Sequence, residues 1–65
     1  MKFAIRFDFP GADPVFAGMY KGAAGFAPTL ATAKTWGKRE DAVRFLTASY
    51  GSSAGYGTVV PVTGP

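Results

Sequence analysis

A strict alternation of apolar and polar side chains near the N-terminus constrains the fold of this chain more than any other feature. Because successive side chains of a strand point to opposite faces, an alternation with period two predicts a strand with one buried face. The pattern covers residues 2–9, with Phe3, Ile5, Phe7 and Phe9 on one face and Lys2, Ala4, Arg6 and Asp8 on the other. We therefore expect a strand at residues 2–9 whose phenylalanine face contacts the core.

A second strand is expected at residues 15–21. The segment from Pro10 to Pro14 holds two prolines, a glycine and an aspartate, which favour a chain reversal after the first strand. Periodicity does not decide which face of the second strand is buried. One face carries Val15, Ala17 and Met19, and the other carries Phe16, Gly18 and Tyr20.

The rest of the chain reads as a loop, a short helical turn, one long helix and a last strand. Residues 22–25 are expected to form a loop, and Thr29 to cap a turn through residues 30–33. The helix is expected to begin at Lys38, which places Glu40 at its third position, and Gly51 is expected to end it. Its apolar stripe is Ala42, Val43, Phe45, Leu46 and Tyr50. Residues 52–55 are expected to form a loop before a last strand at residues 56–62, which Pro61 confines to a sheet edge.

These elements predict an α+β domain with the order strand, strand, helix, strand. A crossover through a helix joins parallel strands, so the last strand should run parallel to the second and lie beside the first. The prediction is a three-stranded sheet in the order 2-1-3 with the helix on one face. Residues 1–62 form the single domain and residues 63–65 a frayed tail.

The residue types of the chain argue against catalysis and against metal or cofactor binding. The 65 residues include no Cys, no His and only four acidic side chains, whereas acid–base and nucleophilic chemistry draws mainly on these groups. The position of each acidic residue, in a turn, at the helix start or on a strand face, also fits a local structural role. We therefore predict no catalytic, cofactor-binding or metal-binding residues and no enzymatic activity.

Hydropathy predicts a cytoplasmic protein without a membrane segment. The apolar N-terminal stretch contains Arg6 and Asp8, which interrupt the core that a signal peptide needs. No run approaches the roughly 20 apolar residues that span a bilayer. The formal net charge of +3 permits an anionic partner without requiring one.

Several segments together resemble a recurrent pattern in short uncharacterised proteins of actinobacteria and their bacteriophages. They are Tyr20-Lys-Gly, Gly25-Phe, Leu30-Ala-Thr-Ala33, Trp36-Gly-Lys-Arg39-Glu-Asp-Ala42 and Val59-Val-Pro-Val62. The sequence departs from the pattern at Gly37 and Lys38, where Ser or Thr usually caps the helix. The resemblance implies an accessory protein of a phage or mobile element that acts in the host cytoplasm.

The leading functional hypothesis is a non-enzymatic accessory factor that binds a protein, such as a host protein, through an exposed sheet face or edge. Since one helix covers only one face of the sheet, the other face is expected to stay open, and self-association into a homo-oligomer remains an option. The residues expected to bind protein are Phe16 and Tyr20, or Val15 and Met19. The alternative is a small nucleic-acid-binding protein that uses Lys2, Arg6, Tyr20, Lys21 and Lys34.

Overall fold

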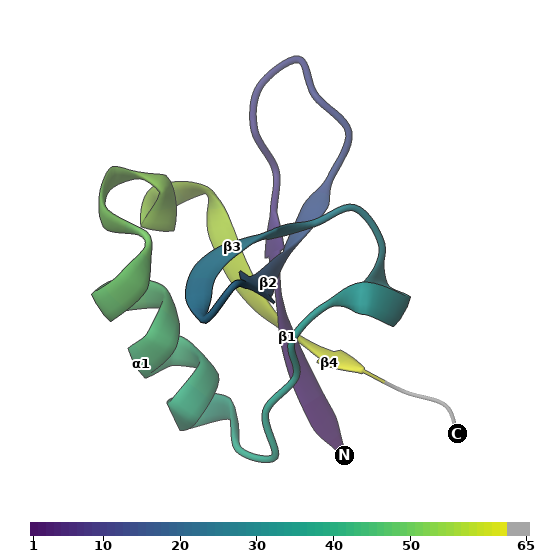
Figure 1. Cartoon of the computed structure of the whole chain (residues 1–65), viewed down its shortest axis with the longest axis vertical. Helices are drawn as coiled ribbons and strands as arrows, with labels where there is room; N and C mark the ends of the chain where they lie inside the picture. The colour runs from purple at the N-terminus through teal and green to yellow at the C-terminus, as the bar shows by residue number, and fades with distance from the viewer. Residues whose placement is uncertain (63–65) are drawn as a thin grey trace.

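The computed structural model describes residues 1–62, which form a four-stranded antiparallel sheet with one α-helix against one side (Figure 1). The predicted α+β class is confirmed. The elements in chain order are the strands β1 (Lys2–Phe7), β2 (Val15–Tyr20) and β3 (Ala23–Ala27), the 3-10 helix η1 (Leu30–Thr32), the helix α1 (Arg39–Ser49), the 3-10 helix η2 (Gly51–Tyr56) and the strand β4 (Gly57–Val62). The predicted tail at residues 63–65 lies outside the described residues.

The strand order is β3-β2-β1-β4, so the prediction of three strands in the order 2-1-3 is wrong by one strand. The last strand does lie antiparallel beside β1, and therefore runs in the same direction as β2, as expected. The missed strand is β3, which occupies most of the segment that was expected to be a loop. Two glycines and the following Pro28 obscured it, because all three residues are typical of turns.

The turn between β2 and β3 consists of two residues only. Lys21 and Gly22 have φ angles of 52° and 80°, and Tyr20 pairs directly with Ala23. Positive φ at both central positions defines a type I′ turn, the tight reversal that matches the twist of a β-hairpin. The second strand therefore ends at Tyr20, one residue earlier than predicted.

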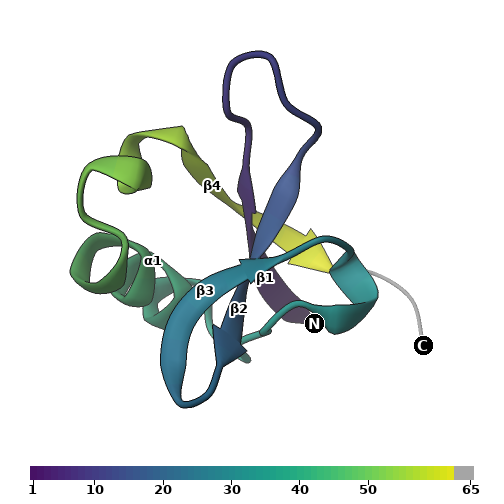
Figure 2. The same cartoon turned by 45° about the horizontal axis from the view of Figure 1, so that its top comes forward.

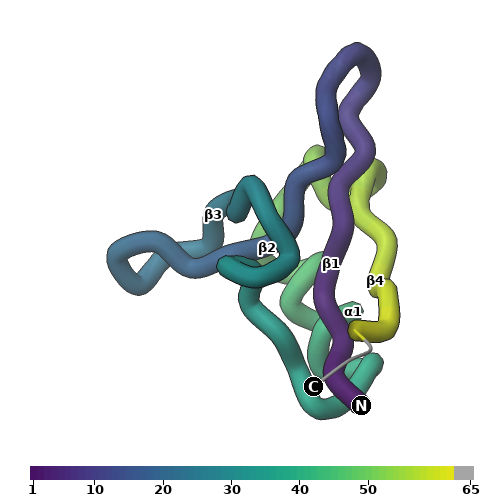
Figure 3. The backbone as a smooth tube through the Cα atoms, turned by 90° about the vertical axis from the view of Figure 1, so that its right-hand side faces the viewer, coloured from purple at the N-terminus to yellow at the C-terminus, as the bar shows by residue number. Residues whose placement is uncertain are grey.

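The first strand has different neighbours along its length. On one side it pairs with β4 from Lys2 to Phe7, and on the other it pairs with β2 at only two positions. Beyond these positions β2 turns away from β1, and Figure 3 shows the β2–β3 hairpin projecting sideways. The segment before α1 takes the place of β2 beside the first residues of β1. The backbone N–H and C=O of Phe3 bond to those of Trp36 at 2.8 Å each, and the Lys34 N–H donates to the Ala17 carbonyl at 2.9 Å. We call the projecting hairpin, residues 18–25, the arm.

The hydrophobic core lies between the sheet and α1. It is built around Ile5 and Phe7, both 0% exposed, with Ala42 and Leu46 from the helix and Val59 from β4. The predicted core of the first strand is confirmed. Of the predicted apolar stripe of the helix, Ala42 and Leu46 belong to the core, Phe45 and Tyr50 pack against it, and Val43 is exposed. Val43 is 40% exposed.

The sheet face opposite α1 is less open than predicted. Ala4, which was assigned to the polar face of the first strand, is fully buried, and Ala27 on the same face is only 6% exposed. The chain between β3 and α1 crosses this face, where η1 contacts β2 (Figure 3). The expectation that a single helix leaves one whole face uncovered is therefore wrong, because a connecting segment covers part of it.

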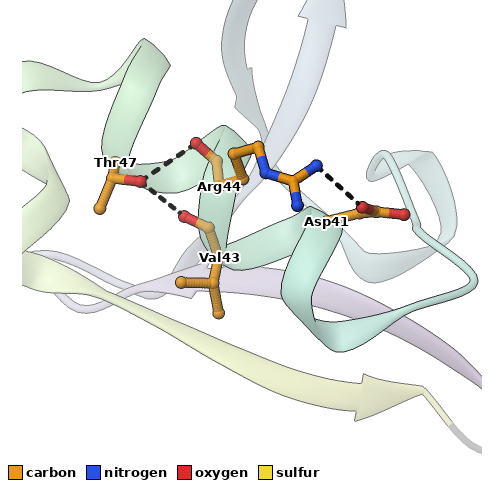
Figure 4. A network of polar contacts seen from close by, with 4 residues as sticks. All are labelled: Asp41, Val43, Arg44 and Thr47. Atoms are coloured by element: carbon orange, nitrogen blue, oxygen red, sulfur yellow. Dashed lines mark hydrogen bonds and ion pairs between the residues drawn. The ribbon is translucent and has the colours of Figure 1, made fainter.

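The helix begins one residue later than predicted, at Arg39. Glu40 is therefore its second residue and Asp41 its third, and Lys38 occupies the cap position without a side-chain cap bond. Asp41 pairs with Arg44 at 3.3 Å on the exposed face (Figure 4). The hydroxyl of Thr47 donates to the carbonyls of Val43 and Arg44, at 2.9 and 3.1 Å.

The segment after the helix also differs from its prediction. Gly51 has a φ of 54°, which confirms it as the left-handed stop. The residues that follow form η2 rather than a loop, and β4 starts at Gly57 rather than at Tyr56. Any larger residue at position 57 would displace core side chains, because a Cβ atom there would lie 2.6 Å from Leu46 Cδ1 and 3.0 Å from Phe7 Cε1. The helix can therefore approach the sheet closely at this position.

Candidate interaction surface

The end of the arm presents two large side chains that are exposed to solvent. Met19 is 48% exposed and Tyr20 is 70% exposed, and neither belongs to the hydrophobic core or to the residues packed around it. Because they are neighbours in a strand, they point to opposite faces of the hairpin. The Lys21 Nζ atom lies 5.5 Å from the centre of the Tyr20 ring, within reach of a cation–π interaction. We call Met19, Tyr20 and Lys21 the tip.

The four residues that are expected to bind protein differ in their exposure in the structure. Val15 packs against the core, on the same side of β2 as Ala17. Phe16 points to the other side and is half-buried. Only Met19 and Tyr20 are well exposed, one from each of the two alternative faces. Exposure in β2 therefore depends on the position along the strand rather than on the face of the strand. The first residues of β2 lie in the body of the sheet, and the last ones lie in the projecting arm.

A row of three aromatic rings continues the apolar surface from β3 toward η2. Phe9 lies between Phe26 and Tyr56, with ring centres 5.7 and 5.1 Å away. Phe26 is 50% exposed and Tyr56 is 46% exposed. Sequence reasoning missed this row, because Phe26 comes from a segment that is expected to be irregular, and the predicted strands at residues 2–9 and 56–62 do not place Phe9 beside Tyr56. The available signal was the presence of large aromatic residues in stretches otherwise made of glycine, alanine and serine.

Tyr50, the residue that follows α1, fastens the arm to the body. Its hydroxyl donates to the carbonyl of Gly25 at 2.6 Å, and its ring lies 4.8 Å from Phe7 and 5.4 Å from Phe26. Burial raises the pKa of the Tyr50 hydroxyl above its usual value, and a hydrogen bond with the backbone of Gly18 opposes that shift in part. The neutral phenol is thus the form that the fold prefers.

Replacing Tyr50 by Phe should make the fold less sensitive to alkaline pH. Near neutral pH the change should lower the free energy of unfolding by about 0.5–1.5 kcal/mol, the usual net value of one hydrogen bond. Because the folded-state pKa is raised, the unfolded chain releases the Tyr50 proton first, and this contribution is lost as the pH rises above 10.0. Urea titrations from pH 7 to pH 11 should therefore show a difference between wild type and Tyr50→Phe that shrinks with pH. A constant difference would contradict the role of the neutral hydroxyl.

The strand β3 lies at one edge of the sheet, with no strand on its outer side (Figure 2). The pairing with β2 defines which of its backbone groups point to that side. A two-residue hairpin turn is closed by a hydrogen-bonded pair, here Tyr20 and Ala23, and bonded and non-bonded pairs then alternate along the ladder. The N–H and C=O groups of Ala24 and Phe26 therefore point away from β2. The Lys34 bond to Ala17, the residue that pairs with Phe26, agrees with this alternation, since the Ala17 carbonyl also points away from the hairpin.

The basic residues of the alternative hypothesis are not gathered into one surface. The Arg6 Nε atom forms an ion pair with Asp8 at 3.1 Å, and Lys34 lies over the Trp36 ring at 5.5 Å. Lys2 and Lys21 belong to the first strand and to the hairpin turn. The sheet face that Lys2 and Arg6 share with Tyr20 is interrupted in the middle, where Ala4 and Ala27 are covered.

Within residues 1–62 no group of three His, Cys, Asp or Glu side chains lies close enough together to hold a metal ion. An open depression of about 540 Å³ is lined by Lys38, Arg39, Glu40 and Val43 at the start of α1. Its lining contains one carboxylate, that of Glu40, together with the cationic side chains of Lys38 and Arg39. The described part of the chain includes no helix with the length and apolar character needed to cross a bilayer.

The geometry thus singles out the arm as the candidate interaction surface, with its exposed tip, its free strand edge and the adjoining aromatic row. Comparisons of the chain with protein-family models, with curated protein sequences and with solved structures found no match.

Proposed function

We propose that this protein is a non-enzymatic accessory factor that binds another protein through the tip of its arm. The observation that carries the proposal is the exposure of Met19 and Tyr20 on a hairpin that leaves the body of the sheet. A projecting hairpin with two large side chains can enter a pocket of a partner, which a flat sheet face cannot do.

The chemistry of the tip suits a protein partner. Tyrosine is enriched among the residues that dominate the energy of protein interfaces, and methionine adapts its shape to irregular apolar pockets. Lys21 beside Tyr20 adds one cation, so the partner pocket should be apolar with an acidic rim. The resemblance of the sequence to actinobacterial and bacteriophage proteins makes an actinobacterial host protein the partner class that we propose.

The test compares three forms of the full chain as bait in an actinobacterial lysate. The forms are the wild type, the double variant Met19→Ala with Tyr20→Ala, and the control Val43→Ala, whose side chain is also exposed but lies on α1. Wild type and control should enrich the same proteins, as quantified by mass spectrometry. The double variant should lose at least about tenfold of that enrichment, as expected when interface residues of this type are truncated.

Two results would overturn the proposal. Equal enrichment by all three baits would show that the tip is not the binding surface. Binding of the wild type to single-stranded oligonucleotides, with an affinity that falls steeply with salt and is lost in the double variant, would make the protein a nucleic-acid binder instead. Circular dichroism of each bait should first establish that its fold is retained.

A further inference from the structure

We infer that the free edge of β3 pairs with the same edge of a second copy, in an antiparallel register centred on Gly25. This surface is distinct from the tip that the proposed function uses. An unprotected strand edge is a template for strand addition, and proteins usually block such an edge with charged side chains, proline or a covering segment. The strand β3 has the sequence AAGFA, which contains no charged residue and no proline. Within residues 1–62 it forms backbone–backbone hydrogen bonds with β2 and with no other segment.

The positions of the free backbone groups make this edge complementary to itself. Gly25 is the middle residue of β3, and the groups that point outward belong to its two neighbours, Ala24 and Phe26. In an antiparallel pair with a two-fold axis at Gly25, Ala24 of one copy faces Phe26 of the other. Each of these pairs exchanges both of its N–H to C=O bonds, as in a regular antiparallel ladder. All five residues of the strand are matched in this register, with no overhang.

The side chains fit the same register, because every cross-strand pair contains at least one small residue. Ala23 faces Ala27, Ala24 faces Phe26, and Gly25 faces itself across the axis. Phe26 is half-exposed in the single copy, on the side of the sheet that faces α1. Pairing places Ala24 and Phe26 of the second copy beside it and so covers its free surface. Isologous contacts of this kind are the usual basis of two-fold dimers.

Electrostatics does not oppose the contact, although the chain carries a net charge of +3. No charged side chain lies within β3. The first cation beyond it is Lys21, and the register places it across from Thr29 of the second copy rather than from another cation. Because a single pair of five-residue strands buries a small area, the dimer should be weak, at the low end of specific interfaces.

A single cysteine provides a direct test, since the chain has none of its own. Two Cα atoms that face each other in a non-hydrogen-bonded antiparallel pair are about 4.5 Å apart, which is within disulfide range. Gly25→Cys should therefore form a covalent dimer under mild oxidation. A side chain is accommodated there, because its Cβ atom would lie 3.7 Å from that of Tyr20. In the control Ala24→Cys the two thiols come from positions roughly 8 Å apart, too far for a disulfide.

A proline at position 24 tests the backbone bonds. Ala24→Pro removes an N–H that points outward, so the pairing of β2 with β3 is kept, while Ala24→Thr keeps the N–H. Sedimentation equilibrium between about 1 μM and about 1 mM should show a monomer–dimer equilibrium for wild type and Ala24→Thr. Ala24→Pro should raise the dimer dissociation constant at least about tenfold.

A wild type that stays monomeric over this range, or a Gly25→Cys variant that cross-links no faster than Ala24→Cys, would overturn the inference. Neither result affects the proposed function, because lysate proteins bound at Met19 and Tyr20 should be captured equally by Ala24→Pro and by wild type. Loss of capture in Met19→Ala with Tyr20→Ala should likewise leave the disulfide of Gly25→Cys intact. The two proposals can therefore fail separately.

Discussion

Replacing Phe7 by Ala should lower the free energy of unfolding by about 3–5 kcal/mol, because it empties the space of a fully buried ring. The ring of Phe7 lies within 6 Å of those of Phe9, Phe26 and Tyr50, so its removal also deprives the aromatic row and the arm of support. A domain of this size has a total stability of roughly 3–10 kcal/mol. The variant should therefore be largely unfolded at 37 °C.

The matched control for this prediction is Phe9→Ala. Phe9 carries the same side chain, stacked on Phe7 at 5.8 Å, but it is only partly buried. Its truncation should cost roughly 1–2 kcal/mol, in proportion to the smaller area removed from water. Urea denaturation followed by circular dichroism measures both variants. Equal midpoints for the two would show that Phe7 is not the centre of the core.

Replacing Ile5 by Ala should cost about 2–4 kcal/mol, and Ile5→Val only about 0.5–1.5 kcal/mol. Ile5 is fully buried and pairs with Val59 of β4, so the cavity left by Ala is closed on the strand side and cannot fill with water easily. Thermal unfolding of both variants measures the graded loss. An unchanged melting temperature in Ile5→Ala would mean that β1 has the opposite face toward α1.

The alternation in β1 made the core predictable, because a strand in which every second residue is a large apolar side chain has one low-energy orientation. The helix was predictable from the spacing of Ala42, Leu46 and Tyr50 and from Gly51 at its end. Its first residue was misplaced by one, since neither Gly37 nor Lys38 carries a side chain that caps a helix.

The strand β3 and the covered sheet face could not be read from local patterns. A strand made of AAGFA has neither the β-branched residues nor the alternation that mark a strand, and it is formed because β2 offers a partner across a two-residue turn. The departure of β2 from β1 depends on Trp36 replacing it beside Phe3, a contact between residues 33 positions apart. For the candidate site, the sequence identified Met19 and Tyr20 as possible binding residues. Their exposure could not be predicted, because it results from β2 turning away from β1.

The pairing of β1 with β4 has a consequence for synthesis of the chain on the ribosome. Lys2 pairs with Val62, so the strand that is made first receives its full-length neighbour only when the last described residues have been made. Until then the apolar face of β1 is not fully buried, and its backbone groups toward β4 have no strand to pair with. The domain should therefore fold only after its translation is finished, and truncated products that stop before Gly57 should aggregate or be degraded rather than persist as folded fragments.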